Sequence, residues 1–291
     1  MNRAHLLIVD PQNDFCDLPE SLLPQLHGER LRPALAVPGA HADMQRLAAL
    51  VDAAGDRLSD ITVTLDSHAF VAIERTTFWR DASGQEVPPF TRITAACVAA
   101  GIHVPVNGQA IEAISGKPLT ERVIELLTRL EQAGRYTLMA WPVHCVTGSW
   151  GACIHPELDA ALRRWERHAA APVRKVHKGE YPLAEQYGVF EAETPLEAVP
   201  STCFNRELAS SLLGPGTRLL VAGEASSHCV AASIEQLLAF RGGDGRGIML
   251  ITDCMSPVAG FEAGQNAFFQ RARAAGVALC RAEEALLALS Q

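Results

Sequence analysis

Short apolar runs alternate along the chain with longer stretches in which apolar residues recur at helical spacing. The runs have the length of buried strands and lie at 5–9, 61–65, 136–140, 218–222 and 248–252, with weaker ones at 173–176 and 277–280. The helical stretches between them lie at about 41–54, 119–133, 156–168, 205–213, 228–240 and 261–275. Such alternation is typical of a parallel sheet that helices cover on both faces. We therefore predict a three-layer α/β/α sandwich around a parallel sheet of about six strands.

Two regions interrupt this pattern. Residues 16–38 are rich in Pro and Leu, and residues 80–118 are rich in Gly and Pro and contain a few possible strands. Segments of this length without clear elements usually form a functional cover or an added hairpin. We predict a single domain over residues 1–291 with an insertion at about 80–118, for which a lid and a subunit contact are the two hypotheses.

Composition narrows the class of partner. The 291 residues carry a formal net charge of -8 and no long basic run, which argues against nucleic acid and anionic membrane. No stretch approaches the roughly 18 apolar residues of a membrane span, and the first residues lack the pattern of a signal peptide. We expect a cytoplasmic protein that acts on a small molecule, and a homo-oligomer is compatible with the sequence. The eight cysteines include no CxxC pair and do not predict a disulfide framework.

Reactive side chains follow the predicted strands directly. Asp10 follows the first strand, Lys178 lies just past the weak strand, and Cys229 lies in the turn after a later strand. Ligands bind at the carboxyl ends of the strands in an open parallel sheet, so we expect these side chains to converge. Ser226 or Ser227 would cap a helix with Cys229 in its first turn, where the helix dipole and an ammonium favour the thiolate.

This arrangement predicts a cysteine hydrolase. Asp10 could accept or relay a proton, Lys178 could hold the developing charge, and backbone N–H groups at 224–229 are candidates for an oxyanion hole. The alternative is that Cys229 is a buried structural thiol.

A second cluster has the composition of a metal site. Asp66 ends a predicted strand, His68 lies two residues further, and His144 follows the run at 136–140. One carboxylate and two imidazoles suit Zn, Fe or Mn. The alternative is a histidine hydrogen-bonded to an aspartate near the surface. Phe15 and Trp141 could flank a flat substrate or belong to the core.

Seven segments together resemble one protein family, the isochorismatase-like cysteine hydrolases, and within it the longer members of the nicotinamidase/pyrazinamidase branch. They occur in the family's order and are LLIVDPQNDFC (6–16), ALAVPGA (34–40), TLDSH (64–68), WPVHC (141–145), HKGEY (177–181), VAGEASSHCV (221–230) and ITDCMSPVAGFE (251–262). The stretch at 80–118 matches only in nearby fragments such as FW (78–79) and PPF (88–90).

The resemblance implies the roles of individual residues. It implies a catalytic set of Asp10, Lys178 and Cys229, a cis peptide bond before Ala225, and an oxyanion hole formed by the amides of Ala225 and Cys229. It also implies a divalent metal, with zinc as the first choice and iron or manganese as alternatives. Its ligands would be Asp66, His68 and His144, and Phe15 and Trp141 would sandwich a pyridine ring.

One departure from the family lies beside the metal cluster. Many relatives carry another histidine shortly after the D-x-H pair as a fourth ligand, whereas this chain has Glu74 and Arg75. Glu74 is a further candidate ligand, and Arg75 would displace the metal or close the site.

The implied activity is hydrolysis of a small carboxamide such as nicotinamide to the acid and ammonia, through a thioester. A related hydrolase of ureido, carbamoyl or other amides is the first alternative. Vinyl-ether cleavage of isochorismate is disfavoured, because that branch does not need the cysteine. A catalytically silent binding protein on the same fold is the alternative from another class.

Overall fold

A six-stranded parallel sheet forms the centre of the computed structural model, which describes residues 3–106, 108–214 and 216–290. The strand order is β12-β11-β10-β1-β4-β9, and every neighbouring pair is parallel. The strands are β1 (Arg3–Val9), β4 (Asp60–Asp66), β9 (Arg174–Lys178), β10 (Thr217–Gly223), β11 (Ile248–Ile251) and β12 (Ala278–Cys280). The predicted sheet is confirmed.

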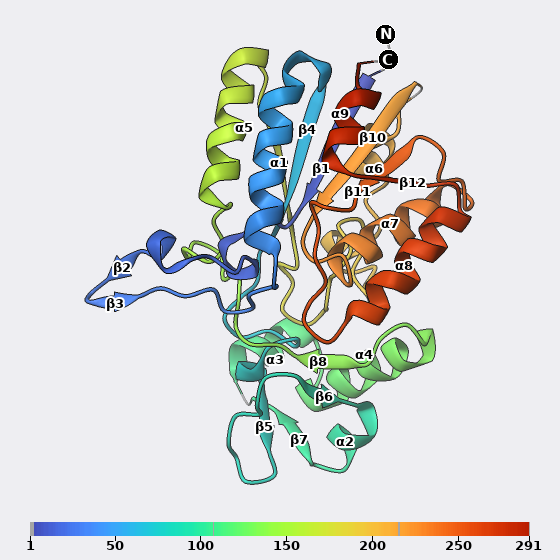
Figure 1. Cartoon of the computed structure of the whole chain (residues 1–291). Helices are drawn as coiled ribbons and strands as arrows, with labels where there is room; N and C mark the ends of the chain where they lie inside the picture. The colour runs from blue at the N-terminus through green and yellow to red at the C-terminus, as the bar shows by residue number, and fades with distance from the viewer. Residues whose placement is uncertain (1–2, 107, 215, 291) are drawn as a thin grey trace.

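Helices cover both faces of the sheet, which gives the predicted three layers (Figure 1). In α1 the buried Met44, Leu47 and Val51 recur at helical spacing and form the stripe that faces the sheet. Helix α7 is buried on nearly all sides, because it lies between the sheet and α8. One face carries α1 (Ala40–Ala54), α5 (Pro156–Ala169) and α9 (Ala282–Ala288). The other face carries α7 (Cys229–Phe240) and α8 (Glu262–Ala274). Helix α6 (Arg206–Leu212) precedes β10 in the chain.

A glycine lets the ends of β1 and β10 approach each other closely. Gly223 has a φ of 116°, and a Cβ at this position would lie 2.0 Å from the carbonyl oxygen of Val9. Only glycine accommodates both the conformation and the contact. The turn that follows β10 is therefore held against the carboxyl end of β1, where Asp10 begins the next loop.

One predicted strand of the sheet is wrong. The apolar run at 136–140 contains β8 (Leu138–Ala140), which pairs antiparallel with β6 (Thr91–Ile93) outside the main sheet. The edge of the sheet is formed by β9 instead, which pairs with β4. The apolar side chains of β8 are buried in a second hydrophobic cluster. They are therefore shielded from water although β8 does not join the central sheet.

This second cluster organises the lower lobe in Figure 1. The lobe contains the short strands expected in the insertion and two short helices that were not predicted, because five to seven residues are too few for a helical period to show. Its elements are β5 (Trp79–Asp81), β6, α2 (Ala95–Ala99), β7 (His103–Pro105), α3 (Gln109–Ser115), α4 (Leu119–Ala133) and β8. The assignment of residues 1–291 to one domain with an insertion at 80–118 stays a prediction.

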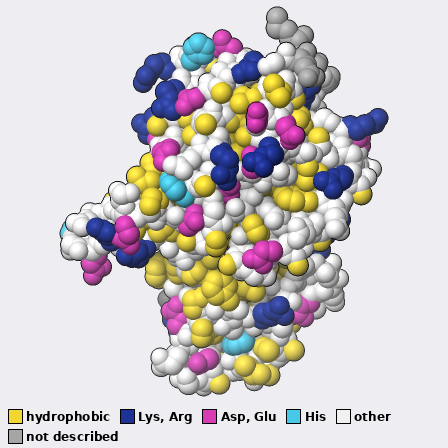
Figure 2. Space-filling model, in the orientation of Figure 1, with side chains coloured by type: hydrophobic (Ala, Val, Ile, Leu, Met, Phe, Trp, Pro, Cys, Tyr) yellow, Lys and Arg dark blue, Asp and Glu magenta, His cyan; other side chains and the backbone are white. Residues whose placement is uncertain are grey.

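The loop at 16–38 carries a small hairpin of β2 (Gln25–Leu26) and β3 (Glu29–Arg30), which projects from the body of the protein (Figure 1). Positive and negative side chains are intermixed over the face of the molecule in Figure 2. Among the described residues, no helix combines the length and apolar character that crossing a membrane would require.

Candidate active site

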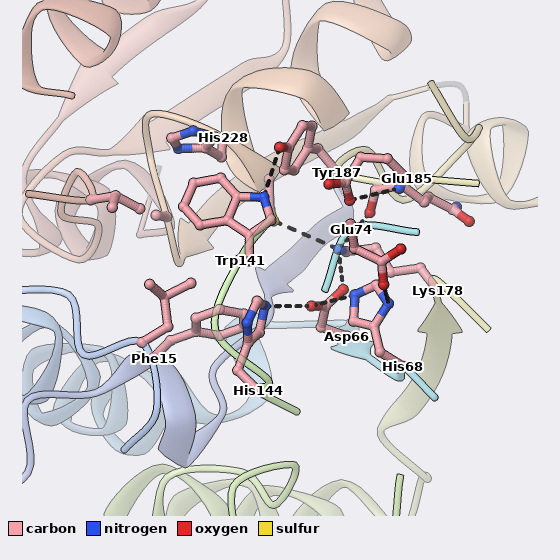
Figure 3. A pocket seen from close by; sticks show the side chains of 15 residues that line it. Phe15, Asp66, His68, Glu74, Trp141, His144, Lys178, Glu185, Tyr187 and His228 are labelled. Carbon is pink, nitrogen blue, oxygen red and sulfur yellow. Dashed lines mark hydrogen bonds and ion pairs between the residues drawn. The ribbon is translucent and has the colours of Figure 1, made fainter. Parts of the chain in front are cut away.

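A pocket opens where the carboxyl end of the sheet meets the lower lobe. Strand β1 leads to it through Asp10, β4 ends in it with Asp66, and β9 ends in it with Lys178. Figure 3 shows the lining side chains converging from these strands, from the turn before α7 and from the segments around 74 and 141. The lining residues are Phe15, Leu35, Asp66, His68, Glu74, Trp141, His144, Lys178, Glu185, Gln186, Tyr187, Ala225, His228, Cys229 and Val258.

The three residues of the predicted catalytic set meet beside this pocket. The Lys178 Nζ lies 3.0 Å from Asp10 Oδ2 and 3.6 Å from Cys229 Sγ. It also lies 2.7 Å from Asp66 Oδ1 and donates to the carbonyl oxygen of Gln186 at 3.1 Å. Asp10 and Lys178 are fully buried, and Cys229 is 8% exposed. A carboxylate, an ammonium and a thiol that are far apart in the sequence therefore lie in contact.

Burial and mutual charge set the protonation of this group. Burial alone would lower the pKa of Lys178, but Asp10 and Asp66 hold it well above its usual range, so the ammonium stays charged. Burial raises the pKa of Asp10, with partial opposition from Lys178. Burial also raises the pKa of the Cys229 thiol well above its usual range, and the ammonium does not overcome this. The ammonium favours the thiolate as expected, but burial outweighs it, so the resting group is a thiol.

Two residues at the turn between β10 and α7, Ala225 and Cys229, line the pocket. The Glu224–Ala225 peptide bond is cis, as the resemblance implied. Cys229 is the first residue of α7, so its N–H has no acceptor within the helix. Among the described residues, the backbone N–H groups of Ala225 and Cys229 donate to no backbone carbonyl outside regular elements. Both amides are therefore free to hold an oxyanion.

The predicted serine caps of α7 are wrong. The N-cap residue is His228, and its side chain makes no capping hydrogen bond. Ser226 instead accepts a hydrogen bond from Gln265, and Ser227 accepts one from the N–H of Val258. These serines tie the turn to α8 and to the segment before it, and neither caps the N-terminus of α7.

Asp66, His68 and His144 converge as predicted. The Asp66 Oδ2 lies 2.8 Å from His68 Nε2 and 3.4 Å from His144 Nε2, and all three residues are buried. Ligand atoms that share an ion at bond lengths of about 2.1 Å stand at comparable separations from one another. One carboxylate and two imidazoles on one side of an ion also form a common donor set for Zn, Fe or Mn. The residues present thus fit a divalent metal.

The charges of this cluster are linked. Burial would lower the pKa of His68, but the Asp66 carboxylate raises it to about 9. Burial lowers the pKa of His144 to about 4, and the charge of Arg75 adds to the effect. In the absence of a metal, one imidazole is therefore charged and the other neutral at neutral pH.

Glu74 and Arg75 extend the cluster on its far side. The Glu74 Oε1 lies 2.8 Å from His68 Nδ1, the ring nitrogen that faces away from Asp66. A carboxylate on the second nitrogen of a ligating histidine fixes the orientation of the ring. The structure thus places Glu74 behind His68 and does not group it with the three candidate ligands. The Arg75 guanidinium is fully buried and lies against His144.

Aromatic rings form two walls of the pocket (Figure 3). Phe15 packs edge-on against His144 with ring centroids 5.1 Å apart. The Trp141 Nε1–H donates a hydrogen bond to the Tyr187 hydroxyl at 3.0 Å, which fixes the plane of the indole. The insertion reaches this wall, because the half-exposed Phe90 packs against Trp141 with centroids 5.7 Å apart.

Besides the apolar Leu35 and Val258, four residues that line the pocket were missed at the sequence level: Glu185, Gln186, Tyr187 and His228. The first three lie in an irregular segment after β9, where no periodic pattern marks an orientation. His228 directly precedes the predicted nucleophile and could have been flagged by that adjacency. Burial and then the charge of Glu74 raise the pKa of Glu185 to about 8, so this carboxyl group is neutral at neutral pH.

No family model matches the sequence, and no curated protein matches it. Solved structures do match. A nicotinamidase/pyrazinamidase from Acinetobacter baumanii superposes with a TM-score of 0.58 and 17% identity, covering 98% of this chain and 98% of that chain. The yeast nicotinamidase bound to the inhibitor nicotinaldehyde has a TM-score of 0.60 and 18% identity, covering 96% of this chain and 99% of that chain. A protein from L. infantum in complex with nicotinate has a TM-score of 0.53 and 20% identity, covering 97% and 94%.

At these identities, the likeness establishes the fold. This chain therefore has the isochorismatase-like fold of the nicotinamidases and pyrazinamidases, which is the fold that its sequence motifs predicted.

Proposed function

We propose that this chain is a cysteine-dependent amidohydrolase that converts a small carboxamide, such as nicotinamide, to the acid and ammonia. One observation carries the proposal: the Lys178 ammonium lies within 3.6 Å of both the Asp10 carboxylate and the Cys229 thiol, beside a pocket with two free backbone amides. The fold shared with nicotinamidases supports the same class of substrate.

The first half of the reaction acylates the enzyme. The resting thiol passes its proton to the Asp10 carboxylate as Sγ attacks the amide carbonyl, and Lys178 stabilises the sulfur as negative charge develops on it. The amides of Ala225 and Cys229 hold the oxyanion of the tetrahedral intermediate. Asp10 then returns the proton to the leaving nitrogen, the C–N bond breaks, and ammonia departs from a thioester.

The second half releases the acid. Asp10, again ionised, takes a proton from a water molecule that attacks the thioester carbonyl. The C–S bond breaks, the proton returns to sulfur, and the carboxylic acid leaves. The buried position of Asp10 suits this role, because burial raises its pKa and makes it a better proton acceptor.

The substrate ring would lie between Phe15 and Trp141, with the amide toward Cys229. Asp66, His68 and His144 would hold a divalent metal, zinc first among the candidates. When bound, the metal supplies a positive charge for a ring nitrogen and so orients the ring. Bond cleavage itself is assigned to Asp10, Lys178 and Cys229 only.

One observation favours a second candidate, a hydrolase of ureido or carbamoyl compounds. Among the described residues, the pocket wall carries two buried carboxyl oxygens without hydrogen-bond partners, Oε2 of Glu74 and Oε2 of Glu185. Substrates with additional N–H donors would satisfy such oxygens, and leaving them unpaired is costly.

The test is ammonia release from a panel of carboxamides, ureido compounds and carbamoyl compounds. Wild type is compared with Cys229→Ala, with metal-stripped protein, and with Cys254→Ala as a matched control, since Cys254 is buried outside the pocket. The proposal expects turnover of nicotinamide that Cys229→Ala abolishes and Cys254→Ala retains. Turnover restricted to ureido or carbamoyl compounds selects the second candidate. Unchanged turnover in Cys229→Ala contradicts the mechanism.

A further inference from the structure

A permanent cation stands against one of the candidate metal ligands. The Arg75 side chain is fully buried, and its Nη1 contacts both ring nitrogens of His144, Nδ1 more closely and Nε2 at 2.9 Å. The Nδ1 atom also lies 2.8 Å from the carbonyl oxygen of Pro142, to which it donates when Nε2 carries the lone pair. The same Nη1 donates to the carbonyl oxygen of Pro142 at 3.2 Å. His144 Nε2 is also the atom that lies 3.4 Å from Asp66 Oδ2. One imidazole nitrogen therefore faces both a guanidinium and the carboxylate with which it would share a metal.

The backbone holds Arg75 in this position. The segment around Arg75 forms a parallel bridge with Trp141, in which the Trp141 N–H donates to the Glu74 carbonyl at 2.8 Å. The Thr76 N–H donates to the Trp141 carbonyl at 3.1 Å. His144 follows three residues after Trp141, so this bridge fixes the guanidinium and the imidazole relative to each other.

The Arg75 guanidinium and a metal ion cannot both interact with the same lone pair of His144. A neutral imidazole has one free lone pair, and a metal ion needs that lone pair to form its bond. Arginine is donor-only and does not lose its proton in proteins, so its N–H can only occupy the same lone pair. Two like charges side by side in a buried site also repel each other strongly.

The balance of fixed charge points the same way. Three buried carboxylates, from Asp10, Asp66 and Glu74, face two permanent cations, Lys178 and Arg75. With His68 neutral, as a metal ligand must be, one negative charge is then left over. Without Arg75 two would be left over, the number that a divalent ion neutralises.

We propose that Arg75 is a resident competitor of the divalent metal, and that an ion binds to His144 only when the guanidinium leaves the ring. This inference rests on the metal site within the proposed function, but it is independent of the amidase activity. The wild-type protein should bind a divalent ion at least tenfold more weakly than a variant that lacks the guanidinium. Arg75 would thus determine metal occupancy without being a ligand.

The test is titration of metal-free protein with Co²⁺, followed by its absorption spectrum, and with Zn²⁺ in competition. Every protein also carries His41→Ala, because His41, His155 and Glu157 form a second group that could hold a metal. Arg75→Met removes the guanidinium. Arg80→Met is the matched control, since Arg80 is partly exposed and donates instead to the carbonyls of Thr77 and Trp79. We expect affinity to rise at least tenfold in Arg75→Met and to stay unchanged in Arg80→Met.

Two further variants keep the test decisive. Glu74→Gln/Arg75→Met leaves the net charge unchanged and avoids an unpaired buried carboxylate if Arg75→Met alone fails to fold. Its affinity should still exceed that of wild type, because the lone pair of His144 is free. Adding His144→Ala to Arg75→Met should abolish the gain.

Three outcomes would overturn the inference, and they separate it from the proposed function. Equal affinity in wild type and both Arg75 variants, with loss in His144→Ala, refutes the competition while the metal site stands. Absence of binding in every protein refutes the metal site and the competition together, without touching the ammonia-release assay. A metal-loaded crystal in which Arg75 stays 2.9 Å from His144 Nε2 also refutes it.

Discussion

Replacing Lys178 by Met removes the cation that contacts both Asp10 and Cys229. The ammonium is fully buried and lies 3.6 Å from Cys229 Sγ. At this distance, and with an effective dielectric constant of about 20, its attraction for a thiolate is about 4–5 kcal/mol. Since about 1.4 kcal/mol corresponds to a factor of ten, the thiolate fraction at a given pH should fall by about three orders of magnitude. The pKa of Cys229, already raised by burial, would rise further.

The assay is alkylation by iodoacetamide across neutral and alkaline pH, followed by mass spectrometry of the peptide that carries Cys229. The exposed Cys153 is alkylated in the same sample and serves as the internal reference. We expect the rate at Cys229 relative to Cys153 to fall by about a thousandfold in Lys178→Met, because only the thiolate reacts. The variant also leaves Asp10 and Asp66 without their counter-charge, which should destabilise the fold by about 3–5 kcal/mol.

A second variant controls for this loss of stability. Asp10→Asn/Lys178→Met removes one carboxylate with the ammonium and keeps the net charge of the group, so it should be more stable than the single variant. Asp10→Asn alone is the reference for the double variant, because the Asp10 charge itself raises the pKa of Cys229. An unchanged ratio of the two alkylation rates in folded Lys178→Met, or in the double variant relative to Asp10→Asn, would refute the assignment of Lys178 as the group that stabilises the sulfur.

Three further predictions follow from individual contacts. Burial lowers the pKa of His5 from 6.5 to about 4 in the folded protein, so between these pH values the unfolded chain binds a proton at His5 and the folded chain does not. The free energy of unfolding should therefore fall by up to about 3 kcal/mol as the pH drops from 6.5 to about 4. Denaturant melts of His5→Asn should show a flatter pH dependence, and an identical slope would contradict this. Phe90→Ala removes a ring contact of about 0.5–1.5 kcal/mol with Trp141, so KM should rise roughly two- to tenfold with little change in kcat; a fall in kcat alone would argue against a covering role. Cys229→Ala should keep its circular dichroism and melting temperature within a few degrees, whereas unfolding would make its inactivity uninformative.

The parallel sheet and the convergence of the polar residues at its edge were predictable from the sequence. Both follow from the local pattern of apolar runs, helical stretches and the polar residues directly after each run. Asp10 and Asp66 lie at the ends of buried runs and Lys178 ends the mostly exposed edge strand β9, and parallel strands bring such ends to one edge. Cys229 was found by the same logic, since it begins the helix after β10.

What could not be predicted depends on contacts between distant segments. The run that contains β8 looked like a sheet strand, and only the second hydrophobic cluster decides that it pairs with β6. His144 reaches the metal cluster although β8 is outside the main sheet, so its position was predicted for the wrong reason. The direction of the Cys229 pKa shift depends on the degree of burial, which sequence does not reveal.

Glu74 and Arg75, where this chain departs from the family pattern, show the same limit of prediction from sequence. The sequence left open whether Glu74 is a ligand and whether Arg75 displaces the metal or closes the site. In the folded chain Glu74 lies on the far nitrogen of His68, and Arg75 lies against His144. Their positions follow from the bridge to Trp141, a pairing between segments more than sixty residues apart.

The most direct test of the catalytic assignment is to trap the acyl-enzyme. Wild type is mixed with whichever amide it hydrolyses, quenched in acid within the first turnover, and digested for mass spectrometry of the peptide that carries Cys229. The account predicts an acyl group on the sulfur of Cys229 that forms before steady state and decays as acid is released. Ammonia release at the wild-type rate with no acyl group on Cys229, or with the acyl group on another residue, would contradict it.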